Sequence, residues 1–90
     1  MKDTTRCVKE DCKILRGIIN QKSNNAIKKN NVRIWIDSFN SIYKRLVALI
    51  DICETQNAKK HVYNTIEICS RRNTDIINFF TNNGGINNGN

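Results

Sequence analysis

The sequence contains no proline, and three of its four glycines lie within residues 82–90. Signals for β-turns are therefore sparse in the rest of the chain. Because an all-β fold needs turns at short, regular intervals, this scarcity argues against a β-sandwich or β-barrel and favours helices. The last nine residues, NNGGINNGN, are too polar and too rich in glycine to pack into a core. The sequence thus predicts one helical domain over residues 1–81 and a flexible tail over residues 82–90.

Long apolar runs are also missing. No stretch reaches the roughly 18 consecutive apolar residues that suggest a transmembrane helix, so no membrane span is expected. The N-terminal segment, MKDTTRCVKEDCK, is polar and charged and lacks the apolar region of a signal peptide. These two features leave the location of the protein open.

The residues that usually carry catalysis are scarce. The chain has one histidine and eight scattered acidic residues. It contains no glycine-rich phosphate loop, no nucleophile elbow and no pairing of histidine with carboxylates. We therefore expect a non-enzymatic protein with no cofactor, no resident metal and no evident small-molecule substrate.

Apolar residues recur at helical spacing in three segments, at about residues 5–20, 32–55 and 58–81. The first helix has one stripe of Val8, Cys12, Leu15 and Ile19. The other two have heptad seams with 4-3-4-3-4 spacing. These seams are Trp35, Phe39, Ile42, Leu46, Leu49 and Cys53, and then Val62, Ile66, Cys69, Asn73, Ile76 and Phe80.

The segments between these helices set the expected architecture. Residues 20–31 read as a polar, basic linker, with Asn30 or Asn31 as the cap of the next helix. Residues 32–36 alternate like a short β-strand, so a strand there, or a helix start at Asp37 or Ser38, is the alternative. The connection near residues 56–57 is very short, which makes its two helices antiparallel neighbours. The predicted fold is all-α: a small three-helix bundle in which helix 1 packs on an antiparallel hairpin of helices 2 and 3.

Four cysteines, Cys7, Cys12, Cys53 and Cys69, allow three interpretations. They can be buried free thiols, because unpaired cysteine behaves as a small apolar residue. They can be two disulfides, for which an up-down-up bundle favours Cys7–Cys53 with Cys12–Cys69. A zinc site that also uses His61 is the third interpretation, although the spacing lacks the usual short C-x-x-C knuckle. Disulfides would indicate a virion or extracellular setting, and free thiols the cytosol or nucleus.

The net charge is +7, and the positive residues are spread along the chain. Such a charge suits contact with phosphates or another acidic surface, but it also suits an ordinary solvated surface. The segment from Lys28 to Arg33 is the best candidate for a phosphate-contacting loop. The candidate contact residues are Lys28, Lys29, Arg33, Lys44, Arg45, Lys59, Lys60, Arg71 and Arg72.

Two functions follow as hypotheses. The first is a structural or adaptor protein that acts through helix-face contacts with a protein partner or with itself, as a minor component of a large assembly such as a virion. The heavy use of Asn, Ile and Lys, whose codons are A/T-rich, points to an A/T-rich genome, such as that of a large DNA virus, of certain protists or of some bacteria and phages. The second hypothesis is a small basic nucleic-acid-binding module.

Overall fold

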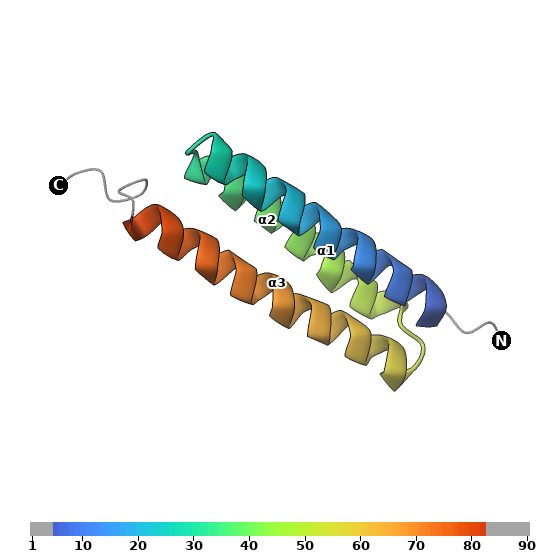
Figure 1. Cartoon of the computed structure of the whole chain (residues 1–90). Helices are drawn as coiled ribbons and strands as arrows, with labels where there is room; N and C mark the ends of the chain where they lie inside the picture. Colours follow the sequence, from blue (N-terminus) through green and yellow to red (C-terminus); the bar gives the residue numbers. More distant parts are fainter. Residues whose placement is uncertain (1–4, 83–90) are drawn as a thin grey trace.

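The structure, a computed structural model, describes residues 5–82 and contains three helices: α1 (Thr5–Lys28), α2 (Val32–Ile52) and α3 (Gln56–Asn82). Each helix packs against the other two. The chain runs up, down and up, so α1 and α3 point the same way and α2 points the opposite way (Figure 1). The described residues contain no strand, which confirms the predicted all-α three-helix bundle.

The first helix is longer than predicted. It continues to Lys28, so the prediction of a linker over residues 20–31 was wrong. The reason is that the buried stripe continues beyond Ile19 through two small residues, Ser23 and Ala26, both fully buried. Neither residue is hydrophobic or large enough to stand out in a sequence pattern.

The true connection between α1 and α2 is only residues 29–31. Asn30 adopts a left-handed conformation with φ of 48°, which asparagine tolerates better than most residues. The backbone N–H of Asn31 bonds to the Ala26 carbonyl and that of Asn30 to the Ile27 carbonyl, the pattern of a Schellman helix end. The Asn31 side chain then caps α2 by accepting from the N–H groups of Arg33 and Ile34, at 3.0 and 3.3 Å.

The end of α2 and the start of α3 also differ from the sequence-based expectations. Residues 32–36 are helical, so neither the alternative strand nor the later start at Asp37 is present. α2 ends at Ile52, three residues earlier than expected, and α3 begins at Gln56, two residues earlier. Thr55 makes this early start favourable, because its Oγ1 accepts a hydrogen bond from the Ala58 N–H at 3.1 Å.

The core follows the predicted stripes. Its largest fully buried side chains are Trp35, Phe80, Leu46, Val8 and Val62. Asn73, the one polar member of the two seams, accepts a hydrogen bond at 2.8 Å from the indole Nε1–H of Trp35. The polar seam position therefore satisfies the buried tryptophan donor.

No helix within residues 5–82 is both long enough and apolar enough to cross a membrane. Residues 83–90, which form most of the predicted tail, lie outside the described part of the chain, and Asn82 is the last residue of α3.

Candidate functional site

The four cysteines are free thiols, so the preferred disulfides, Cys7–Cys53 and Cys12–Cys69, are not formed in the structure. The parallel arrangement of α1 and α3 explains why the second pair is poorly placed. The Cys12 Sγ donates to the His61 carbonyl at 3.8 Å, which sets the two residues level with each other. Cys69 lies eight residues further along α3, about 12 Å along the axis, whereas a disulfide needs Cα atoms within about 7 Å.

Cys53 and Cys69 lie in environments typical of unreactive thiols rather than of nucleophiles. Cys12 and Cys69 are buried, Cys53 is half-buried, and Cys7 is exposed. Burial raises the pKa of the Cys69 thiol; the nearby Arg16 opposes this rise and Cys12 adds to it. Burial also raises the pKa of Cys53, whose Sγ donates to the Leu49 carbonyl at 3.1 Å. A raised pKa reduces the thiolate fraction, and with it the reactivity.

Metal ligands are not gathered in the described residues: no group of three or more His, Cys, Asp or Glu side chains there is placed to hold an ion. His61 is half-buried near the start of α3. Its backbone carbonyl accepts hydrogen bonds from the Cys12 thiol and from the Thr65 hydroxyl.

The predicted phosphate-contacting residues are spread over the molecule. Lys28, Lys29 and Arg33 lie around the turn between α1 and α2. Lys44 and Arg45 lie in the second half of α2, and Lys59 and Lys60 lie in the first turns of α3. Arg71 and Arg72 form a cluster with two further basic side chains.

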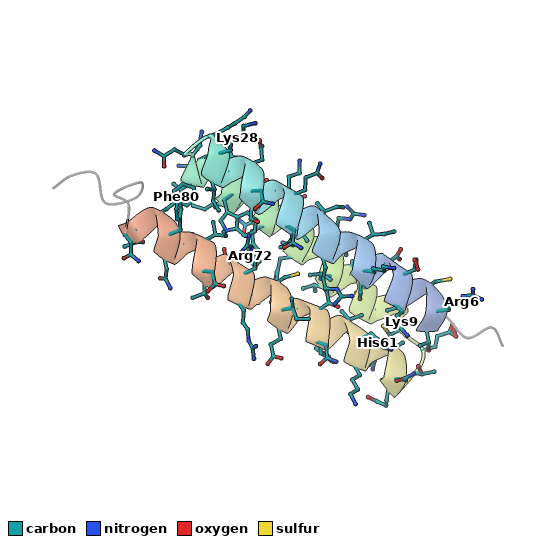
Figure 2. The ribbon with its side chains drawn as sticks, viewed as in Figure 1. Arg6, Lys9, Lys28, His61, Arg72 and Phe80 are labelled. Atoms are coloured by element: carbon teal, nitrogen blue, oxygen red, sulfur yellow. The ribbon has the colours of Figure 1, made fainter. Side chains whose placement is uncertain are left out.

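That cluster lines an open groove of about 550 Å³ between α1 and α3, called here the α1–α3 groove. Its basic residues are Lys13 and Arg16 from α1, and Arg71 and Arg72 from α3. The groove is also lined by Ile19, Asn20, Ile68, Cys69 and a single acid, Asp75. Figure 2 shows the labelled Arg72 lying between the ribbons of α1 and α3.

Arg72 is fixed in place by a buried hydroxyl. Its Nε and Nη2 atoms both donate to Ser23 Oγ, at 3.3 and 3.2 Å. Ser23 in turn donates to the Asn20 carbonyl at 3.0 Å. Lys13, Arg16 and Ser23 were not predicted from the sequence as parts of this site. Ser23 had been assigned to a linker, and nothing in the sequence shows that residues of α1 lie beside Arg72 of α3.

A second groove, of about 430 Å³, lies between α1 and α2. It is lined by Ile18, Lys22, Asp37, Ser38, Ser41, Ile42 and Arg45. Its charged residues are of mixed sign, with two bases and one acid, so it is less suited to a polyanion than the α1–α3 groove.

The third surface feature is apolar. Ile36, Tyr43 and Val47 of α2 are 39, 40 and 42% exposed. Together with the half-buried Phe39 and Ile50 they repeat at helical spacing, and they are called here the α2 apolar face. The rings of Phe39 and Tyr43 stack with centroids 5.8 Å apart. Of the three helices, α2 makes the least extensive contact with the other two.

Comparisons with known proteins give no relative: no family model, no curated protein and no solved structure matches the chain.

Proposed function

We propose that the protein is a non-enzymatic structural protein that self-assembles by packing the α2 apolar face of one copy against that of a second copy. The observation that carries the proposal is the exposure of Ile36, Tyr43 and Val47 on one side of one helix. Scattered apolar side chains on a surface are ordinary, but a contiguous exposed face is typical of an interaction site.

The face has the form expected for helix–helix packing. It runs from Ile36 to Ile50, which is about 21 Å along the helix axis. Its members recur at intervals of three and four residues, as side chains do when they interlock with a neighbouring helix. The stacked rings of Phe39 and Tyr43 lie at its centre, where aromatic side chains contribute most to association.

The charges that flank the face favour a second copy as the partner. Arg33 lies just before the face and Asp51 just after it, and both are exposed. They are separated by 18 residues, which is about five helical turns, so they lie on the same side of α2. When two α2 helices pack antiparallel about a two-fold axis near Ile42, Arg33 of each copy comes level with Asp51 of the other.

The assembly is expected to be weak and to depend on concentration. The face has five apolar residues, far fewer than the roughly 20–30 residues that each partner contributes to a standard stable interface. Mass action therefore separates the copies on dilution, and the flanking ion pairs weaken further at high salt.

Light scattering coupled to size exclusion, over a range of loading concentrations, tests the proposal. The wild type is expected to shift from monomer towards dimer as concentration rises, and the variant Val47→Glu to remain a monomer. Ile14→Glu is the matched control, because Ile14 is exposed on α1 outside the face. It is expected to dimerise like the wild type.

A charge exchange tests the identity of the partner. Arg33→Glu alone is expected to weaken dimerisation, and the double variant Arg33→Glu/Asp51→Arg to restore it, because both reversed pairs then re-form. A wild type that stays monomeric at all concentrations would refute self-assembly. A Val47→Glu protein that still dimerises would refute the α2 apolar face as the contact surface.

A further inference from the structure

The geometry points to a second activity on a different part of the bundle: we infer that the α1–α3 groove binds the phosphate backbone of a nucleic acid. Lys13, Arg16, Arg71 and Arg72 line the groove with one acid, Asp75, which gives the lining a formal charge of +3. Clustered positive charge along a groove is the electrostatic feature expected for such a ligand. The inference does not depend on self-assembly.

The positive charge of the groove is available to a ligand. Lys13, Arg16 and Arg71 are all exposed. Within residues 5–82 none of these three side chains forms an ion pair with a carboxylate. A phosphate that enters the groove therefore meets cations that do not first have to leave an internal partner.

Arg72 is already held in position. Two of its donors are bound to Ser23 Oγ, and Ser23 is itself fixed through the Asn20 carbonyl. The guanidinium has five N–H donors, so further donors are left for a phosphate oxygen. Holding the side chain in advance lowers the entropy cost of ordering it when a ligand binds.

The length of the cluster favours a chain of phosphates over a single phosphate. Arg72 is level with Ser23, because the two are hydrogen-bonded. Lys13 lies ten residues before Ser23, so the basic residues extend over about 15 Å of the groove. Phosphates in one strand of a duplex are about 3.4 Å apart along the axis, so this length matches about four nucleotides.

The groove has no surface on which bases could stack. Its lining contains no aromatic side chain on which a base could stack. We therefore expect binding without sequence preference, driven by contacts with phosphates and released by salt.

Fluorescence anisotropy with two labelled probes, a single strand of about 20 thymidines and a mixed-sequence duplex of about 20 base pairs, tests the inference. Titration at several salt concentrations gives the slope of the logarithm of affinity against the logarithm of salt. The wild type is expected to bind at low salt with a steep slope. The variant Arg16→Glu/Arg71→Glu is expected to bind at least tenfold more weakly, and its slope to fall by about 1.4 on the single strand, about 0.7 for each lost phosphate contact.

The matched control is Arg45→Glu/Lys60→Glu, which changes the net charge by the same amount outside the α1–α3 groove. Circular dichroism checks that both double variants remain helical. The control is expected to retain most of the affinity. Equal losses in the two double variants would overturn the groove as the site, because the binding would then follow net charge alone.

Two other results would overturn the inference. One is the absence of binding to both probes at low salt. The other is that pyrophosphate displaces the single strand when both are present at the same concentration of phosphate groups. That result would identify a site for a small phosphate. A monomeric wild type that binds the probes with groove-dependent affinity would refute only self-assembly and support this inference.

Discussion

The hydrogen bond between Trp35 and Asn73 is expected to contribute measurably to the stability of the bundle. Trp35 is fully buried, and its Nε1–H donates to Asn73 Oδ1 at 2.8 Å. In the variant Asn73→Ala the indole donor is left without this acceptor. A buried donor that loses its partner costs about 1–3 kcal/mol, and the lower half of that range applies here, because Asn73 is half-buried and water can approach.

Thermal unfolding followed by circular dichroism at 222 nm measures this loss. A destabilisation of 1 kcal/mol lowers the Tm of a domain of this size by about 4–8 °C, so a fall of about 5–15 °C is expected. Urea unfolding at 25 °C gives the corresponding free energy, with an unchanged m-value if the folded state keeps its compactness.

A double-mutant cycle separates the hydrogen bond from the loss of packing. Trp35→Phe removes the donor and leaves an aromatic ring, and it is combined with Asn73→Ala. Since neither group has its partner in the double variant, it is expected to be more stable than the sum of the single losses indicates, by about 0.5–1.5 kcal/mol. Strictly additive losses would refute the hydrogen bond as a stabilising contact.

Three further predictions concern the helix ends and the thiols. Asn31→Ala removes the acceptor for two N–H groups at the start of α2 and is expected to cost about 1 kcal/mol, measured by urea unfolding, whereas the exposed change Asn40→Ala is expected to cost little. A coloured thiol reagent at neutral pH is expected to modify the exposed Cys7 first, and Cys12 and Cys69 only after unfolding; rapid modification of all four would contradict the burial. Burial raises the pKa of Cys69 and Cys53, so these thiols lose their protons at a lower pH in the unfolded chain than in the folded protein. The free energy of unfolding is therefore expected to fall as the pH rises above the ordinary thiol pKa, and to fall less in Cys69→Ala.

The heptad seams were enough to predict the fold, because buried positions in a helical hairpin must recur at that spacing whatever else the chain does. Trp35, Leu46, Val62 and Phe80 all lie on predicted seams and are all buried. The prediction failed where small or polar residues do the packing. Ser23 and Ala26 extend the buried stripe of α1 by two turns beyond Ile19, and their burial depends on the helices beside them.

The candidate surfaces were less accessible to sequence reasoning. Basic pairs were visible in the sequence, but the set that shares a groove combines Arg16 of α1 with Arg71 of α3, and only the parallel packing of those helices places them together. The Cys12–Cys69 pair is poorly placed for the same reason, because the position of Cys12 along α3 is set by packing between helices and not by spacing within one helix. Tyr43 lies outside the predicted seam and is exposed in the structure.

The two proposed surfaces lie on different sides of the bundle, and this affects how they act together. The α2 apolar face lies on α2, whereas the α1–α3 groove lies between the other two helices and contains no residue of α2. Packing two copies through α2 therefore leaves a groove open on each copy. Two grooves on one particle raise the affinity for a long polyanion without any new contact, provided that the ligand spans both. For a short oligonucleotide that reaches only one groove, affinity depends on the groove alone. This arrangement of surfaces therefore predicts that the affinity for a long strand rises with protein concentration, as dimers form. The affinity for a short strand is expected not to change.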